Sequence, residues 1–568
     1  MESLPIGHLD IKDRKVSGAH YTPSILATFV ANQIFKLVSH DKSQKTIRIL
    51  DPAIGDGELI ISIIDVLINN NISNIEIIGF DTDNNALEYA KSRINQYYPK
   101  LKTQLKKIDF LELIQNDYDL IENSLFNNNT DKYDIVISNP PYVRTQVLGS
   151  SKSKDISKIF NLSGRVDLYH AFLVGISKVL NEGAIAGIIV SNRFLTTKSG
   201  SSIRNIIRNN FEIIHLWDLG DTKIFEAAVL PAVLLLKKNG FNDNLLPKFT
   251  SVYSSESENI EGYVNNLFES LSLEGTFQIS DGNTINVRQG IIDFGNSDNS
   301  IWKLSNNSTD SWLNTVKQNT YYTFSDINPI RVGIKTCADK IFIKNNWGVL
   351  DKTEHPENKL LKPLITHHIA NRFRTKYPTK KVLYPHTSIN GKRQTIEIEK
   401  FPKAYKYLIN NKTQLEKRTY VLEAGRKWYE LWVPQDPDVW SKPKLVFWDI
   451  AEKPTFWLDF DGCIVNGDCY WISCDNEDKI DLLWLALAVG NSSFIETFYD
   501  NNYNNKLYAG RRRFISQYVE NFPIPNPNTN NAKELITLSK FLYDNAFSNE
   551  ALSLQNKLNE LVYQCFGL

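Results

Sequence analysis

The stretch Tyr133-Asp134-Ile135-Val136-Ile137-Ser138-Asn139-Pro140-Pro141-Tyr142 decides the fold. Its first six residues form an apolar run, which is typical of a parallel strand buried on both faces. The two prolines then end the strand and stiffen the loop that follows. Open α/β sheets bind their ligands at the carboxyl ends of such strands. The stretch therefore predicts a rigid functional loop at the edge of a parallel sheet.

The loop offers a particular set of groups to a ligand. The amide oxygen of Asn139 and the carbonyl oxygen of Pro140 are both hydrogen-bond acceptors. Together they suit an exocyclic amino group, while the ring of Tyr142 suits the flat heterocycle that carries it. Adenine has this shape. A simpler interpretation, which these residues alone leave open, is a proline-terminated strand followed by a buried tyrosine.

Strands and helices alternate on both sides of this stretch, which predicts a doubly wound α/β sheet. We expect further strands at 46–50, 75–80, 104–108, 184–190, 213–218 and 232–237, and helices at 24–37, 58–68, 84–97, 167–180 and 201–209. Later strands are expected at 444–448, 455–458 and 470–473, and helices at 478–489, 493–499 and within 531–561. We predict an α/β domain at 1–240, a linker with the irregular start of a second domain at 241–310, and a mixed α+β domain with C-terminal helices at 311–568.

The bulk properties narrow the class of protein. A chain of 568 residues is too long for one core. It contains no apolar run of the ~20 residues that a membrane span needs, and its first residues lack the apolar core of a signal peptide. Its five cysteines are an odd number and widely spaced, which argues against a disulfide framework. Three of them, Cys463, Cys469 and Cys474, lie close together without a CxxC pair, so strand packing is preferred to zinc binding.

Charge is distributed unevenly although the formal net charge is zero. Residues 361–420 hold 14 lysines and arginines but only three acids. A local basic surface of this kind suits nucleic-acid phosphates, although a solvated charged face has the same composition. The residues that we expect to contact DNA are Arg372, Arg374, Lys380, Lys381, Lys392, Arg393, Arg511, Arg512 and Arg513.

The segment Asp51-Pro52-Ala53-Ile54-Gly55-Asp56-Gly57 follows a predicted strand and opens a predicted helix. Its small residues allow a ligand to approach the backbone closely. The segment is neither a GxGxxG motif nor a P-loop. Asp51, at the strand end, suits a cation such as an amino-acid ammonium group. The alternative is a tight turn in which Asp51 caps the helix.

Acidic residues also end the next two predicted strands. Asp81 suits the hydroxyls of a ribose, whereas Asp83 suits the N-cap of the following helix. Asp109 suits an adenine amino group, and Phe110 suits the face of its ring. An ammonium, a ribose and an adenine are all parts of S-adenosylmethionine. The loop before residue 24, with Tyr21 and Thr22, is expected over the methionine part.

The order of these motifs resembles the gamma-class (TaqI-like) DNA adenine-N6 methyltransferases of type II restriction–modification systems. The resemblance implies a Rossmann-like S-adenosylmethionine-dependent methyltransferase sheet followed by a DNA target-recognition domain, which Gly333-Ile334-Lys335-Thr336 and Phe522-Pro523-Ile524-Pro525 would open and close. It implies catalytic roles for Asn139, Pro140, Tyr142 and Phe225, the last as a stacking partner of a flipped base. It implies cofactor contacts at Tyr21, Thr22, Asp51, Ala53, Gly55, Gly57, Asp81, Asp109, Phe110 and Asn139. Ala53 replaces the first glycine of the cofactor motif.

The function that the resemblance implies is methyl transfer from S-adenosylmethionine to N6 of a flipped-out adenine in a specific duplex sequence. No metal is expected. The expected partners are double-stranded DNA and a separately encoded restriction endonuclease, in the cytoplasm of a prokaryote near its nucleoid.

Alternatives remain at this stage. The same loop chemistry serves N4-cytosine, protein-glutamine and rRNA methyltransferases, but some 330 residues after Lys237, including the basic stretch, favour a polymer substrate. A non-catalytic DNA-recognition subunit would not need an intact Asn139. A fused nuclease is not expected, because only about twenty residues precede Tyr21 and no nuclease motif is evident.

Overall fold

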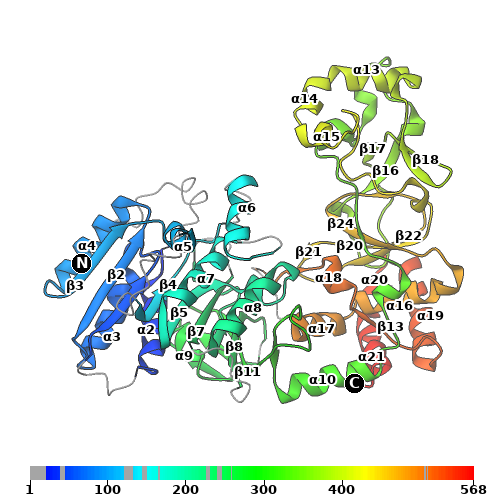
Figure 1. Ribbon diagram of the computed structural model, residues 1–568. Coiled ribbons are helices and arrows are strands. Elements are labelled where there is room, and N and C mark those ends of the chain that lie inside the picture. Colours follow the sequence, from blue (N-terminus) through cyan, green and yellow to red (C-terminus); the bar gives the residue numbers. More distant parts are fainter. Residues whose placement is uncertain are drawn as a thin grey trace. The chain divides into compact units, whose positions relative to one another are not determined.

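The computed structural model describes residues 21–38, 45–119, 132–143, 150–163, 167–225, 230–238, 246–257, 259–503, 507 and 510–568. The chain divides into two compact units. The first comprises residues 1–306 with 504–510, and the second comprises residues 307–503 with 511–568. Figure 1 shows both units along the chain.

A single large sheet organises the first unit. Its strand order is β3-β2-β1-β4-β5-β7-β6-β8-β11-β10-β9, with β12 paired to β11. The strands from β3 to β5 run parallel, whereas β7 runs antiparallel to both of its neighbours. The strands are β1 (Ile47–Asp51), β2 (Ile75–Asp81), β3 (Lys102–Lys107), β4 (Tyr133–Ser138), β5 (Leu180–Ser191), β6 (Glu212–Asp218), β7 (Pro231–Lys237), β8 (Lys248–Ser254), β9 (Gly262–Val264), β10 (Gly275–Ile279), β11 (Thr284–Asp293) and β12 (Lys303–Ser305). The predicted α/β sheet is confirmed.

Helices cover both faces of this sheet (Figure 1). Successive strand residues point to opposite faces, so Ile135 joins the core beneath α2, α3 and α4, while Val136 joins the core beneath α5, α7 and α8. Apolar residues at both positions explain why the central strands read as continuous apolar runs. The helices are α2 (Ser24–Phe35), α3 (Glu58–Asn69), α4 (Asn84–Tyr97), α5 (Phe110–Asp119), α6 (Ser150–Ile159), α7 (Leu168–Val179), α8 (Ser201–Asn210) and α9 (Leu267–Ser270).

The segment 241–310 departs from the prediction of a linker and an irregular start of the second domain. Its described residues include β8 to β12, which extend the sheet of the first unit, and residues up to Asn306 belong to that unit. Antiparallel strands can leave one face to solvent, so they need few apolar residues. In β11 only alternate positions such as Ile285 and Val287 are buried at its start, which is why the polar composition concealed the strands.

The second unit contains several small sheets and a set of helices. Its strands are β13 (Tyr322–Thr323), β14 (Arg331–Val332), β15 (Ile343–Lys344), β16 (Leu361–Ile365), β17 (Lys381–Leu383), β18 (His386–Ile389), β19 (Lys392–Thr395), β20 (Lys444–Trp448), β21 (Ile450–Ala451), β22 (Phe456–Asp459), β23 (Ile464–Val465), β24 (Cys469–Ser473), β25 (Arg512–Arg513) and β26 (Pro523–Ile524). Its helices are α10 (Asn307–Gln318), α11 (Phe324–Ile327), α12 (Asp339–Phe342), α13 (Pro402–Asn410), α14 (Lys412–Glu416), α15 (Thr419–Glu423), α16 (Ile480–Gly490), α17 (Ser493–Tyr503), α18 (Ser516–Val519), α19 (Asn530–Asp544), α20 (Asn549–Ser553) and α21 (Gln555–Cys565). The predicted strands at β20, β22 and β24 and the predicted C-terminal helices are present.

Two four-stranded sheets form the centre of the second unit, in the orders β14-β24-β20-β22 and β15-β17-β16-β23. They share a core that includes Trp457 and Trp471, both fully buried. The two marks expected around a recognition domain lie within this unit. The closing mark contributes β26, which pairs antiparallel with β13. The opening mark holds Gly333, where a Cβ would lie only 2.0 Å from the carbonyl oxygen of Asn466.

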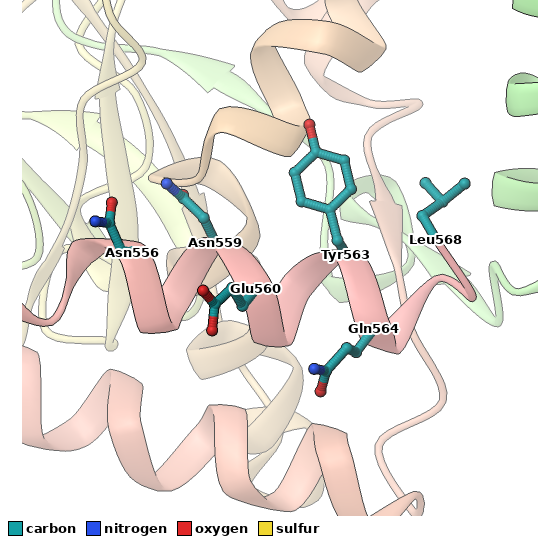
Figure 2. A pocket seen from close by; sticks show the side chains of 6 residues that line it. All are labelled: Asn556, Asn559, Glu560, Tyr563, Gln564 and Leu568. Carbon is teal, nitrogen blue, oxygen red and sulfur yellow. The ribbon is translucent and has the colours of Figure 1, made fainter.

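A surface groove runs along α21 (Figure 2). It is lined by Asn556, Asn559, Glu560, Tyr563, Gln564 and Leu568. None of the motif residues lines this groove, so it is not the site that the sequence predicts. Within the described ranges, no helix is long and apolar enough to cross a membrane. The same residues contain no group of three His, Cys, Asp or Glu side chains that could hold a metal ion.

Candidate active site

The predicted site residues lie along one edge of the first sheet. Asp51 ends β1, Asp81 ends β2 and Asn139 follows β4. Because β2, β1 and β4 are parallel neighbours, their carboxyl ends meet at the same edge. Asp109 follows β3, which is the next strand outward. The topology therefore brings together groups that are far apart in the sequence.

Asp51 is the most deeply buried acid at this edge, with 0% of its surface exposed. Its Oδ1 accepts hydrogen bonds from the Ala53 amide at 3.0 Å and from the Ser138 hydroxyl at 2.9 Å. Among the described residues, its Oδ2 is buried with no hydrogen-bond partner. Burial raises the pKa of Asp51 to about 7, and the nearby charges of Asp81 and Asp56 add to the effect. A buried carboxylate oxygen of this kind needs a cationic or hydrogen-bonding ligand.

Ser138 is a site residue that the sequence interpretation missed. It is fully buried and links the end of β4 to the end of β1 through its bond to Asp51. As the last residue of a buried strand it looked like part of the core. Its position immediately before Asn139 was the only available signal.

The segment after β1 that contains Gly55 and Gly57 forms a sharp turn, and Gly55 borders open space. Gly55 and Gly57 have φ angles of +53° and +81°, which are unfavourable for other residues. A Cβ on Gly55 would have no heavy atom within 4 Å, so its backbone faces space that a ligand can use. The Gly55 amide also donates to Asp81 Oδ2 at 2.9 Å, which joins the ends of β1 and β2. This geometry allows a ligand to approach the backbone of the segment closely.

The other two acids each fix a local turn. Asp81 Oδ1 accepts from the Asp83 amide at 2.9 Å, and burial raises the pKa of Asp81. Asp83 is the N-cap of α4, as predicted, and accepts from the Asn85 amide. Asp109 Oδ1 accepts from the amides of the first turn of α5, with the Leu111 nitrogen at 3.0 Å. A carboxylate has about four acceptor positions, so these bonds leave capacity for ligand hydroxyl or amino groups.

Phe110 lies in the core cluster on the α5, α7 and α8 side of the sheet. Only 1% of its surface is exposed, and its ring centroid lies 5.5 Å from that of Phe172. A Cβ on Gly175 would come within 2.7 Å of the Phe110 ring. A ring that covers a ligand must offer it part of its surface, so this role would require the packing around Phe110 to change. The contact of Phe110 with an adenine ring therefore stays a prediction.

Asn139 is held from both ends of its amide. Its Nδ2 donates to the Thr22 hydroxyl at 3.1 Å, and its Oδ1 accepts from the Tyr142 hydroxyl at 2.6 Å. The first bond ties the loop after β4 to the segment before α2, although 117 residues separate them. The two bonds fix which end of the amide is the acceptor. The oxygen has two lone pairs, so it can accept a further hydrogen bond from a ligand.

Tyr142 is partly buried, and its ring meets that of Tyr169 edge to face at 6.1 Å. Burial raises the pKa of Tyr142, which keeps its hydroxyl protonated as the donor to Asn139. Within the described residues, no backbone amide donates to the Pro140 carbonyl oxygen. The loop thus combines a fixed amide, a backbone acceptor and an aromatic ring.

Phe225 lies in a buried setting after β6. Its exposed fraction is 6%, and it belongs to the core cluster that contains Trp217 and Phe277. Stacking on a flipped base would require this ring to leave part of that cluster. The stacking role therefore stays a prediction, and it needs a change of side-chain conformation.

A polar network at the end of β6 was also missed. Asp218 is fully buried, and it accepts from Asn192 Nδ2 at 2.8 Å and from the Tyr253 hydroxyl at 2.7 Å. Burial raises the pKa of Asp218 to about 6. Tyr253 lies in β8, inside the segment expected to be irregular, so no local pattern indicated its position here. The network holds the start of the loop that leads to Phe225.

The residues expected to contact DNA fall into two groups. Arg512 is buried and forms two hydrogen bonds to Asp500, at 2.9 and 2.8 Å, and one to the Glu452 carbonyl oxygen. Its guanidinium group is paired with Asp500 within the unit, and a contact of Arg512 with DNA stays a prediction. Arg513 is paired with Asp449 at 3.3 Å, and Arg372 donates to Gln555 at 3.1 Å. The exposed members are Arg374, Lys381, Lys392, Arg393 and Arg511, and Lys380 is half-buried.

We expect Asp51 to make the ligand-free protein less stable as the pH rises. Its pKa is about 7 in the folded protein and 3.8 ordinarily, so between these values the folded state keeps a proton that the unfolded state has lost. The protonated Asp51 therefore contributes on the order of 4 kcal/mol to the free energy of unfolding below about pH 4, and this contribution is lost as the pH rises through 7. The Asp51→Asn variant has no titrating group at this position, so the difference between its Tm and that of the wild type should increase from pH 4 to pH 8. Parallel Tm–pH profiles of the two proteins would contradict this prediction.

Comparison with known proteins places the chain in a family. Residues 70–225 match the Eco57I restriction-modification methylase model, and residues 386–524 match the TaqI-like C-terminal specificity domain model. The chain is 38% identical to the type II methyltransferase M.BanIII of Aneurinibacillus aneurinilyticus, over 100% of this chain and 99% of that protein. It is 23% identical to the type II methyltransferase M.BstVI of Geobacillus stearothermophilus, over 92% of each chain.

A solved structure shares the fold. A chain from a DrdV–DNA complex matches with a TM-score of 0.53 and 13% sequence identity, covering 95% of this chain and 58% of that chain. The chain belongs to the type II DNA methyltransferases of restriction–modification systems, a family of S-adenosylmethionine-dependent enzymes, and combines an Eco57I-type methylase region with a TaqI-like specificity domain.

Proposed function

We propose that this enzyme methylates N6 of an adenine within a specific duplex DNA sequence. The observation that carries the proposal is the Asn139 amide, whose oxygen is oriented by Tyr142 and whose nitrogen is anchored by Thr22. An acceptor pair at Asn139 and Pro140 suits an amino group that carries two hydrogens. The aromatic ring of Tyr142, partly buried beside this pair, suits the purine that carries the amino group.

The cofactor fits the edge of the sheet because of the residues present there. Asp51 Oδ2 is a buried acceptor without a partner among the described residues, which suits the ammonium group of the methionine part. Asp81 would hold the ribose hydroxyls, and the open backbone at Gly55 leaves space beside it. Asp109 would accept from the adenine amino group. When bound, S-adenosylmethionine supplies a methyl group that its sulfonium sulfur already activates.

The protein's contribution is to orient the target nitrogen. The N6 lone pair of adenine is delocalised into the ring, so the nitrogen is a poor nucleophile. By accepting both N6 hydrogens, Asn139 and Pro140 favour a pyramidal nitrogen with a directed lone pair. Alignment of this kind supplies much of the acceleration. Asn139 is not a general base, and the extra proton passes from the nitrogen to solvent water after the methyl group has moved.

The target must leave the duplex to reach this edge. Extrusion of a base costs a few kcal/mol, and stacking on an aromatic side chain returns about 1–3 kcal/mol. We assign that stacking to Tyr142, with Phe225 as a second partner once its ring moves. The specificity domain would hold the phosphates and read the sequence. In the cell, we propose that the modification protects DNA from a separately encoded restriction endonuclease.

The competing product is N4-methylcytosine, because its amino group is chemically similar. We expect long-read sequencing of DNA from a methylation-free host that expresses this chain to find N6-methyladenine in one recurring sequence. The same host carrying Asn139→Ala should show no modified base. Modified cytosine in the recurring sequence would show that cytosine, not adenine, is the target base. Unmodified DNA in a host that contains the folded enzyme would contradict DNA as the substrate.

A further inference from the structure

We propose that the hairpin β18–β19, His386–Thr395, enters the DNA major groove and that its outward side chains read base pairs of the recognition sequence. The inference rests on the proposed function for its substrate and adds the element that selects the sequence. The hairpin lies in the second unit, where Figure 1 labels β18 at the periphery. It begins at the first residue of the region that matches the specificity-domain model.

The hairpin is a separate two-stranded ribbon. Within the described residues, β18 and β19 pair only with each other, in the register His386↔Thr395 to Ile389↔Lys392. The turn residues Asn390 and Gly391 have φ angles of +53° and +69°. Asn-Gly with two positive φ angles is the tight turn whose twist matches that of paired strands. A two-residue turn makes the ribbon short and stiff, so its tip has a defined position.

The two faces of the ribbon differ. Directly paired residues share a face, so His386 and Ser388 lie on one face. His386 is buried and accepts from the Leu431 amide at 3.2 Å, and Ser388 donates to Asp438. This face anchors the ribbon to the rest of the unit. The hydrogen-bonding groups of the other face are therefore held in place without being used in the anchoring.

The outward face carries Thr387, Ile389, Lys392 and Gln394. Lys392 and Gln394 are exposed, and Ile389 is 49% exposed. In the major groove a glutamine amide can pair with adenine N6 and N7, a lysine with guanine O6 and N7, and an apolar side chain with a thymine methyl group. The face therefore presents one side chain for each of these recognition modes.

Charge and size agree with a duplex as the occupant. Residues 379–396 hold four basic side chains, Lys380, Lys381, Lys392 and Arg393, and no acid. The strands of a ribbon lie about 4.8 Å apart, and the major groove, about 12 Å wide, admits a two-stranded ribbon. Lys380 and Lys381, which precede the ribbon in the chain, would meet the phosphates, while the outward face meets the base edges.

The test compares Gln394→Ala and Lys392→Ala in the full-length enzyme. Each variant is expressed in the methylation-free host, and long-read sequencing reports the recognised sequence. We expect each change to relax one position of the sequence, with discrimination at that position falling about 5- to 150-fold. Gln414→Ala, an exposed glutamine in α14, is the matched control and should leave the recognised sequence unchanged.

Two outcomes would overturn the proposal. Variants that keep the full wild-type sequence preference show that the ribbon does not read bases. A lower level of methylation at an unchanged recognised sequence shows phosphate contact alone. Because the readout is the recognised sequence, a methylated cytosine in the wild-type experiment would correct the target base and leave the test of the ribbon unaffected.

Discussion

Asn139→Ala should reduce methyl transfer to duplex DNA by at least about 100-fold, the effect expected when an oriented polar group is removed from a reacting centre. The substitution removes the acceptor for the target amino group. It also breaks the bonds to Thr22 and Tyr142 that fix the loop after β4. The assay measures transfer of radiolabelled methyl groups to DNA in single turnovers. Affinity for the duplex should be unchanged, because the specificity domain lies in the other unit.

Two variants sharpen this test. Asn95→Ala removes an amide from an exposed position on α4 of the same unit, and it should retain wild-type transfer. Asn139→Asp keeps an acceptor oxygen but loses the donor to Thr22, so its rate should lie between those of Asn139→Ala and wild type. Full activity of Asn139→Ala would remove the assigned role.

Asp51→Asn should weaken binding of S-adenosylmethionine by at least about 30-fold, which corresponds to the ~2 kcal/mol or more lost when one member of a buried charged pair is removed. The variant keeps the shape of the side chain but not the negative charge that the ammonium group needs. Isothermal titration calorimetry at pH 8 measures the effect. Since the pKa of Asp51 is about 7, wild-type affinity should also rise from pH 6 to pH 8, and the variant should lose this dependence.

The same substitution is expected to stabilise the ligand-free protein above pH 7, so weak binding cannot be attributed to unfolding. Asp65→Asn changes an exposed acid on α3 and should leave binding at the wild-type level. Binding of the donor to Asp51→Asn at wild-type affinity would show that Asp51 serves the fold alone.

The sheet and the order of the site residues could be predicted because they depend on local patterns. A central strand buried on both faces, such as β4, must be apolar throughout, and the prolines after Asn139 mark its end. Acids at the ends of successive parallel strands must meet at one edge whatever the loops do. Both features depend on short stretches of sequence, and the order of the resulting motifs was sufficient to predict the family.

Long-range packing decided what local patterns could not. Strands β8 to β12 extend the sheet of the first unit because they bury alternate residues, a weak signal in a polar segment. Burial assigned Phe110 to the core and Arg512 to an internal ion pair, although both residue types suited a ligand. The bonds of Asn139 to Thr22 and of Asp51 to Ser138 cross 117 and 87 residues.

By itself, the sequence determined which groups end the parallel strands, because strand burial and chain termination are local properties. Only the tertiary structure decided which of those groups remain available to a ligand, because availability depends on neighbours contributed by distant parts of the chain. The buried Oδ2 of Asp51 and the outward face of the β18–β19 ribbon are both consequences of that packing.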